Sequence, residues 1–237
     1  MRFDATLARV ITEQSQEAVE DSGRIPAPGG NVVGPVTPNS MRGRRRLARI
    51  VDAATQLFLR DGYAATSIEA VLEASGGSKA TLYSYFSTKD DLFRAVVQAA
   101  ILSEARPTLA LGDNPRAALV DFVVETFEIM SSPRHRALLR LTVAERERFP
   151  DLARHYYEEW PLRNRRLLEE AFGELEQRRV LPSGTAEQAA DCFVGLITHP
   201  WLIESLLFGD DRLPSTEAVR AKAESAVARF FTFAAHG

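Results

Sequence analysis

The sequence predicts an all-α protein of nine to ten helices, and three observations lead to this fold class. Apolar residues recur at three- and four-residue spacing along most of the chain after residue 40, as they do on one face of a helix. No alternating pattern typical of a strand competes with this spacing. Prolines, glycines and capping residues divide the 237 residues into segments of helical length.

The first predicted helix begins in an arginine-rich stretch near residue 44. Its apolar face, at helical spacing, consists of Leu47, Ile50, Val51, Ala54, Leu57 and Phe58. Asp61 and Gly62 follow this face, and a glycine after the last periodic residue commonly ends a helix. We therefore predict that the helix stops at Asp61-Gly62.

Two short helices are expected next. Thr66-Ser67-Ile68-Glu69 fits a capping box with Thr66 as the cap, because a carboxylate follows the hydroxyl three residues later. Ser75-Gly76-Gly77 is predicted to be a turn, and Ser78 to cap the third helix. In that helix Leu82 and Phe86 are four residues apart, so both can point inward.

The third helix would expose small, hydroxyl-bearing and cationic side chains: Lys79, Ala80, Thr81, Tyr83 and Ser84. Two short helices joined by a glycine-containing turn, with such an outward face, are typical of a helix-turn-helix DNA-binding unit. The charge distribution agrees, because residues 41–89 carry eight basic and four acidic side chains in a chain of net charge −3. A basic head on an acidic body favours double-stranded DNA as a partner.

This segment resembles the N-terminal domain of TetR-family transcriptional regulators. The resemblance rests on A-x-x-L-F-x-x-x-G-Y-x-x-T-S-I at Ala54 to Ile68 and on S-K-x-T-L-Y-x-Y-F-x-x-K-x-x-L at Ser78 to Leu92. Two positions depart from the family pattern. Ser75-Gly76-Gly77 stands where Ala-Gly-Val is usual, and Leu72 stands where a small residue is common.

The resemblance implies a set of DNA-contact residues in this chain: Thr66, Ser78, Lys79, Ala80, Thr81, Tyr83, Tyr85 and Lys89. Four of them match phosphate contacts: Thr66, Ser78, Lys79 and Lys89. Lys79 can also reach a guanine edge. Ala80 and Thr81 would face the groove, where a methyl or hydroxyl group can meet a base. The alternatives are solvated lysines and a Tyr85 that simply packs beside Phe86.

Three regions are expected along the chain. Residues 1–40 are predicted to be a disordered N-terminal extension, because residues 22–40 are dense in Pro, Gly and Ser. The extension could instead touch DNA or a partner, or it could precede a true start at Met41. Residues 41–90 form the predicted DNA-binding domain. Residues 91–237 form the predicted helical ligand-binding and dimerisation domain.

In the second region, a helix opened by Pro133 is expected to bury Leu138, Leu139, Leu141 and Val143. A long apolar helix should run to Phe208, kinked or split by Pro200. The family's last two helices pair with a second copy, which implies a homodimer interface with these residues: Leu196, Ile203, Leu207, Val227, Phe230 and Phe231. Ordinary burial within one chain is the alternative.

The resemblance also implies a pocket for a small-molecule effector. The candidate lining residues are seven aromatic or imidazole side chains of this region and one methionine: Phe122, Phe127, Met130, His135, Trp160, Phe193, His199 and Trp201. Such a set would suit a moderately apolar, planar or anionic compound. Each of these residues could equally belong to the core.

Several classes of function find no support in the sequence. It contains no nucleophile elbow, Walker loop or dinucleotide fingerprint, and no His/Cys pair has metal-ligand spacing, so no cofactor or metal is expected. With Cys192 alone no intrachain disulfide can form, and no apolar run reaches membrane-spanning length, so we expect a cytoplasmic protein.

The sequence thus predicts a homodimeric repressor that binds a palindromic operator and is released by a small molecule. The alternatives are a DNA-binding regulator whose second domain takes a protein partner or no ligand, an activator in place of a repressor, and a helical enzyme.

Overall fold

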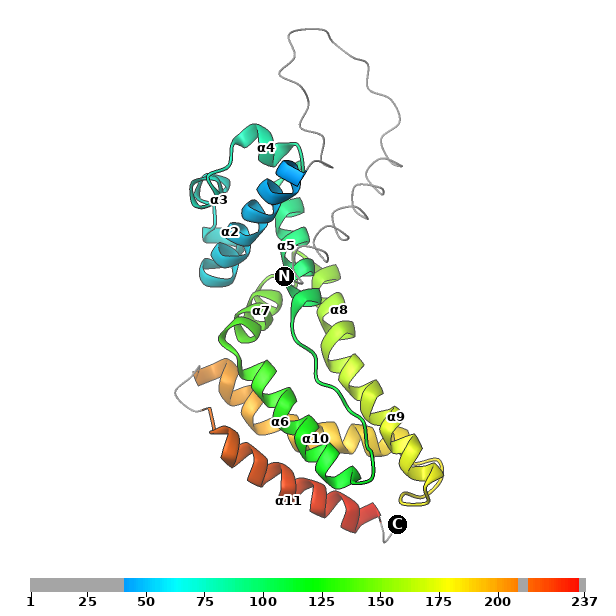
Figure 1. Ribbon diagram of the computed structural model, residues 1–237. Helices are drawn as coiled ribbons and strands as arrows, with labels where there is room; N and C mark the ends of the chain where they lie inside the picture. Colours follow the sequence, from blue (N-terminus) through cyan, green and yellow to red (C-terminus); the bar gives the residue numbers. More distant parts are fainter. Residues whose placement is uncertain (1–40, 209–212, 235–237) are drawn as a thin grey trace. The chain divides into compact units, whose positions relative to one another are not determined.

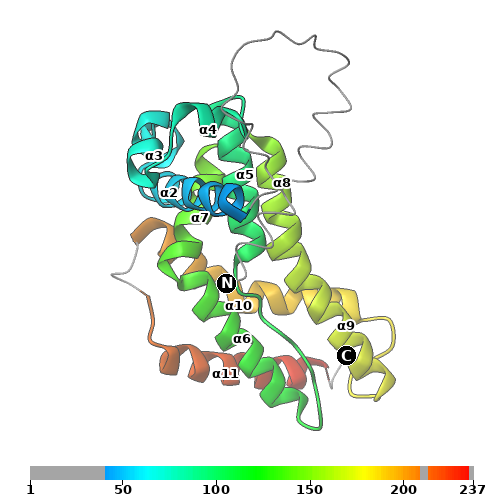
Figure 2. The ribbon, with the colours of Figure 1, turned by 45° about the horizontal axis from the view of Figure 1, so that its top comes forward.

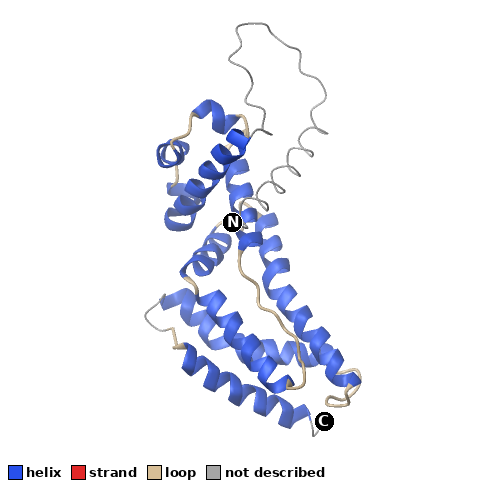
Figure 3. Ribbon diagram, viewed as in Figure 1, coloured by secondary structure: helices blue, strands red, loops and turns tan. Residues whose placement is uncertain are grey.

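The structure, a computed structural model, describes residues 41–208 and 213–234, except for the side chains of residues 41, 42, 44, 197–203, 205, 207, 208, 233 and 234. The predicted N-terminal extension at residues 1–40 lies outside the described residues. Helices and loops account for the whole described part (Figure 3), which confirms the all-α prediction. The chain divides into two compact units.

Unit 1 comprises the described residues up to Ser103 together with Leu141–Ala153. It contains α2 (Met41–Ala65), α3 (Ile68–Ser75), α4 (Lys79–Tyr83) and α5 (Lys89–Ser103), and α2 packs against both α3 and α5 (Figure 1). Gly62 has a φ of 82°, which interrupts α2 at the predicted stop.

The cap of α3 is Ser67, so the prediction that Thr66 caps this helix is wrong. The Ser67 hydroxyl accepts a hydrogen bond from the Ala70 amide at 3.0 Å. Helical structure resumes after Gly62, and the Thr66 hydroxyl donates back to the Gly62 carbonyl at 2.8 Å. Thr66 is consequently buried.

The turn before α4 needs both of its glycines. Gly76 adopts the left-handed conformation, with a φ of 62°, and caps the end of α3. A Cβ at Gly77 would lie only 3.1 Å from Ser75 Oγ and 3.4 Å from Ile50. The backbone at Gly77 thus packs directly on α2. Ser78 caps α4 as predicted, accepting from the Thr81 amide.

Unit 2 comprises Glu104–Arg140 and the described residues from Arg154 onward. Its elements are α6 (Pro115–Ser131), parts of α7 (Pro133–Ala144) and α8 (Pro150–Tyr157), the π-helical turn η1 (Glu158–Leu162), α9 (Arg163–Gln177), α10 (Ala186–Phe208) and α11 (Thr216–Ala234). Helix α6 packs along α11, and α9 packs along α10 (Figure 2).

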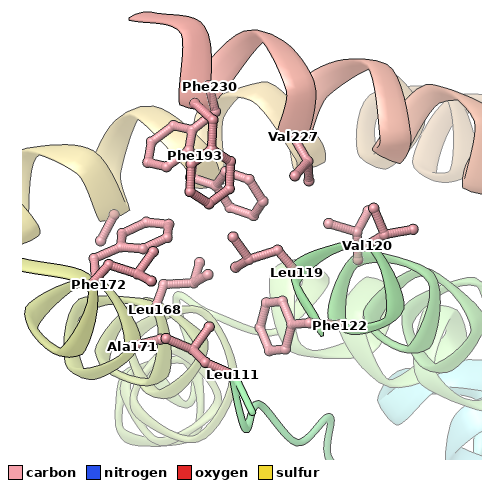
Figure 4. Packing of buried hydrophobic residues seen from close by; sticks show 14 of the residues in the cluster. Leu111, Leu119, Val120, Phe122, Leu168, Ala171, Phe172, Phe193, Val227 and Phe230 are labelled. Carbon is pink, nitrogen blue, oxygen red and sulfur yellow. The ribbon is translucent and has the colours of Figure 1, made fainter. Parts of the chain in front are cut away.

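The core of unit 2 is formed by α6, α9, α10 and α11 (Figure 4). Phe172 of α9 stacks on Phe230 of α11 with 4.9 Å between ring centroids, and Phe193 of α10 meets both rings edge-on. Leu111, from the loop at residues 104–114, joins this core. An apolar cluster therefore holds four helices together within one chain.

Several expectations for this region need correction. Val227, Phe230 and Phe231 are buried in the core of a single chain, so intrachain packing accounts for them. Val143 is 49% exposed, because the buried face of α7 runs through Leu138 and Leu141 instead. These departures reflect tertiary packing that the apolar pattern alone does not specify.

Two further expectations concern α10 and the domain boundary. Helix α10 is not split at Pro200. Leu196 is 54% exposed, whereas the side chains of Ile203 and Leu207 lie outside the described residues. Contacts place residues 91–103 in unit 1, beyond the boundary expected at residue 90.

We expect Phe230→Ala to lower the free energy of unfolding by about 3–5 kcal/mol, because it leaves a cavity among Phe172 and Phe193. Arg229→Ala, on the exposed face of the same helix, is the control and should have little effect. Urea unfolding at two protein concentrations measures the free energy of unfolding of both variants. Equal stability of the two variants would contradict the intrachain core.

Candidate DNA-binding surface and buried polar cluster

Helix α4 presents one buried face and one exposed face. Leu82 and Phe86 are buried as predicted, at 0% and 3% exposure. Lys79, Ala80 and Tyr83 are exposed on the other side, and Tyr83 is 49% exposed. A large aromatic side chain held in solvent beside a lysine is available for a partner.

Lys79 forms an ion pair with Glu69 of α3, with 2.7 Å between Nζ and Oε1. The hydrogen bond that Lys79 donates to Glu69, together with the charge of Glu69, raises the pKa of Lys79, so the ammonium stays charged. Both side chains are more than half exposed, and such pairs are weakened by water and salt. A phosphate can therefore replace Glu69 as the partner of Lys79.

The hydroxyls of α4 and its two capping residues form short-range hydrogen bonds. Ser78 Oγ and Thr81 Oγ1 lie 2.9 Å apart, and Ser84 donates to the Thr81 carbonyl. Thr81 and Tyr85 are half-buried, and the Tyr85 ring is tilted against Phe86 at 6.5 Å. Of the predicted contact residues, only Thr66 is withdrawn from solvent.

Lys89 is the first residue of α5, and its Nζ lies 4.2 Å from the centroid of the Tyr63 ring. Burial and the nearby charge of Arg148 lower the pKa of Lys89. Thr88 and Asp91 cap the helix reciprocally, each accepting from the other's amide at 2.9–3.1 Å. The lysine is thus held at a fixed helix start.

A buried polar cluster lies in unit 2. The Tyr156 hydroxyl and His135 Nε2 are hydrogen-bonded at 2.7 Å, and the His135 and Trp160 rings meet at 4.3 Å. Glu104 accepts from Arg134 at 2.6 Å, and its other oxygen lies 3.6 Å from His135 Nδ1. His135 and Trp160 are both 1% exposed.

This cluster contains two polar atoms without a hydrogen-bond partner, His135 Nδ1 and Trp160 Nε1. The 3.6 Å separation between Nδ1 and Glu104 is too long for a hydrogen bond. A buried donor without a partner is unfavourable, and a bound water or ligand would satisfy it. Trp160 also sits in a π-helical turn, a geometry frequent at functional sites.

The ionisable groups of the cluster are strongly affected by their surroundings. Burial alone would raise the pKa of Glu104, but the His135 ring and the Arg134 guanidinium more than offset it, and the pKa is lowered. Burial and the charge of Glu104 raise the pKa of Tyr156. Glu104 therefore remains a carboxylate and Tyr156 a neutral phenol at neutral pH.

The other predicted ligand residues are dispersed. Phe122 and Phe193 belong to the apolar core (Figure 4), and Phe127 packs with Val124 and Val219. Met130 is half-buried. The side chains of His199 and Trp201 lie outside the described residues.

Sequence reasoning missed Tyr156 and Glu104. Tyr156 precedes Trp160 by four residues, a spacing that could have suggested a shared helix face. Glu104 follows the end of α5 in a loop, and nothing in its neighbourhood marks it as a partner of α7. Only the tertiary structure brings these residues to His135.

A separate open groove of about 410 Å³ lies between α6 and α11. Val120 and Val227 are among its lining residues, and the ion pair between Arg220 and Asp121, at 2.8 Å, joins the two helices there. None of the predicted ligand residues lines it.

The part of the chain that the structure describes contains neither a candidate metal site nor a candidate membrane span. No three His, Cys, Asp or Glu side chains are grouped there so as to hold a metal ion. None of the helices in that part is both long and apolar enough to cross a membrane.

Comparison with known proteins identifies both regions. Residues 50–96 match the family model for bacterial regulatory proteins of the tetR family. Residues 117–233 match the C-terminal domain of AefR-like transcriptional repressors. The two matches fall on the helix-turn-helix and on the helical region that follows it.

Individual proteins agree with the family models. The structure of the flavonoid-responsive regulator FrrA is 32% identical, covers 80% of this chain and 96% of its own, and superposes with a TM-score of 0.66. A TetR-family regulator from Mesorhizobium loti is 26% identical over 82% of this chain and 98% of its own, with a TM-score of 0.65. The HTH-type transcriptional regulator YvkB of Bacillus subtilis is 26% identical over 68% of this chain and 84% of its own.

These relatives are transcriptional regulators rather than enzymes, and the similarity to FrrA extends over almost the whole of that protein. The family models and the relatives together show that the chain belongs to the TetR family of transcriptional regulators.

Proposed function

We propose that this protein represses transcription as a homodimer on a palindromic operator, and that a small molecule bound in its C-terminal region releases it from DNA. The exposed face of α4, with Tyr83 and Lys79 held outward by buried Leu82, carries the proposal. The match to AefR-like repressors supports repression. As a DNA-binding regulator it would act in the cytoplasm.

In the proposed interface Ala80 and Thr81 face base edges and Tyr83 lies against the groove. Ser78, Lys79 and Lys89 contact phosphates, and Tyr85 contacts the DNA at the edge of the interface. Thr66 is left out because its hydroxyl is buried and bonded to Gly62. Two copies of α4 would enter successive major grooves, with centres roughly 34–36 Å or somewhat more apart.

Lys79→Ala and Tyr83→Ala should each weaken operator binding without loss of stability, because both side chains are exposed. For Lys79→Ala, the slope of log affinity against log salt should also fall by about 0.9 per lost phosphate contact. Fluorescence anisotropy over a salt series measures both quantities. Glu69→Gln, which frees Lys79 from its ion pair, is the control and should bind at least as tightly. If both alanine variants keep wild-type affinity, α4 is not the recognition helix.

The homodimer would be formed by the outward faces of α10 and α11. On α11 the exposed residues Ala218, Ala221, Ser225 and Ala228 recur at three- and four-residue spacing, so a second helix could approach closely. On α10 Leu196 is 54% exposed, and nothing lies within 4 Å of a Cβ built at Gly195. An exposed leucine beside an open glycine suits a helix from another copy.

Leu196→Asp should therefore shift the protein from dimer to monomer, because it places a charge in the proposed interface. Val180→Asp replaces another exposed hydrophobic residue, 43% exposed and outside these faces, and should remain dimeric. Sedimentation velocity distinguishes the two states. A Leu196→Asp dimer as tight as the wild type would show that the interface lies elsewhere.

The effector would bind at the cluster of His135, Tyr156 and Trp160. The two unpartnered atoms there, Trp160 Nε1 and His135 Nδ1, can bond oxygen atoms of a ligand. The flavonoid response of FrrA, a relative 32% identical, supports a planar aromatic compound with hydroxyl or carbonyl groups. Such a ligand could stack on the aromatic rings while pairing both atoms.

A panel of planar hydroxy-aromatic compounds tests this proposal by thermal shift. A true effector should stabilise the protein by about 2.7 kcal/mol at roughly 100 times its Kd, and should reduce operator affinity. Trp160→Phe keeps an aromatic ring but removes the Nε1 donor, so it should reduce both the stabilisation by the compound and its effect on operator affinity. Tyr157→Phe, at a residue 55% exposed, is the control. If no compound acts through Trp160, a protein partner or the absence of any ligand becomes the better account.

A further inference from the structure

The turn between α7 and α8 belongs to the C-terminal region by sequence, but its contacts place it with the helix-turn-helix. Its residues lie within the stretch at 117–233 that matches the C-terminal domain of AefR-like repressors. Yet Leu141–Ala153 is part of the same compact unit as the helix-turn-helix. The C-terminal region thus contributes a segment that packs on the DNA-binding helices.

Arg148 makes the polar part of this contact. Its Nη2 lies 3.1 Å and 3.2 Å from the two carboxylate oxygens of Asp90, in the first turn of α5. Its guanidinium also lies 4.5 Å from the centroid of the Tyr63 ring. The Tyr63 hydroxyl donates a hydrogen bond to the same Asp90 carboxylate. Asp90 therefore joins α5, the end of α2 and the α7–α8 turn.

Phe149 makes the apolar part. It is 1% exposed, and its ring lies 4.7 Å from Phe93 and 5.3 Å from Tyr63. Arg94 lies over the same ring at 4.9 Å and pairs with Asp151 of α8. A buried aromatic ring flanked by two ion pairs fixes the turn against α2 and α5.

The Tyr63 ring carries a second cation, Lys89, at 4.2 Å. Lys89 immediately precedes Asp90, whose carboxylate is engaged by Arg148 and Tyr63. Without Arg148 this carboxylate would keep its charge and lose its guanidinium partner. The Lys89 ammonium already interacts electrostatically with Asp90. It would then be drawn further toward this carboxylate and away from DNA.

We infer that Arg148 is a positioning residue for DNA binding: by engaging Asp90 it keeps Lys89 available for a phosphate. The inference rests on the proposed function, in which Lys89 contacts DNA.

The test is a set of operator affinities measured over a salt series with the full chain. Arg148→Ala should weaken binding about fivefold or more and lower the salt slope by about 0.9, as Lys89→Ala does. In the Lys89→Ala background, Arg148→Ala should have no further effect. Arg146→Ala, two residues away and 61% exposed, is the matched control and should bind normally.

A rescue separates this role from simple destabilisation. Arg148→Ala combined with Asp90→Asn should regain most of the lost affinity, because no competing carboxylate remains for Lys89. A contact that merely stabilises the fold would instead give a double variant no better than the single one. Such a result, or an effect of Arg148→Ala that persists without Lys89, overturns the inference.

The outcomes also distinguish this inference from the proposed function. If Lys79→Ala and Tyr83→Ala weaken binding but Lys89→Ala does not, α4 remains the recognition helix and Arg148 is not a positioning residue for DNA binding. If none of the three weakens binding, the proposed DNA interface itself is wrong.

Discussion

Burial of Leu82 and Phe86 is the constraint on which the DNA-binding surface depends. Helix α4 is only five residues long, and a helix of that length is not stable by itself in water. Its orientation is therefore set by these two anchors, by the Ser78 cap and by the close packing of Gly77 on Ile50. Because the anchors point inward, Lys79 and Tyr83 must point outward.

The second region adds two further kinds of packing. An apolar core around Phe172 and Phe230 joins α9 and α11, whereas His135, Tyr156 and Trp160 form a polar cluster with unpaired atoms. A core without such atoms favours one stable arrangement. A cluster with unsatisfied donors can gain free energy from a ligand, which makes it the better candidate for an effector-sensitive element.

Local signals in the sequence predicted the helix-turn-helix well. The stop at Gly62, the Ser78 cap and the buried Leu82 all depend on neighbouring residues, and the structure confirms each. Thr66 was misplaced because two adjacent hydroxyls, Thr66 and Ser67, can both cap, and only the course of α2 after Gly62 decides between them. The core position of Phe230 and the partners of His135 required tertiary contacts. Arg148 carried no local signal, since its partner Asp90 lies 58 residues away.

The central claim is that two copies of α4, held rigidly outward, read a duplex together. Selection of bound fragments from a pool of random double-stranded DNA tests this claim most directly. The account predicts enrichment of a palindrome whose half-sites lie roughly one helical turn or somewhat more apart. A selection that yields no preferred sequence, or only single half-sites bound by monomers, would contradict it.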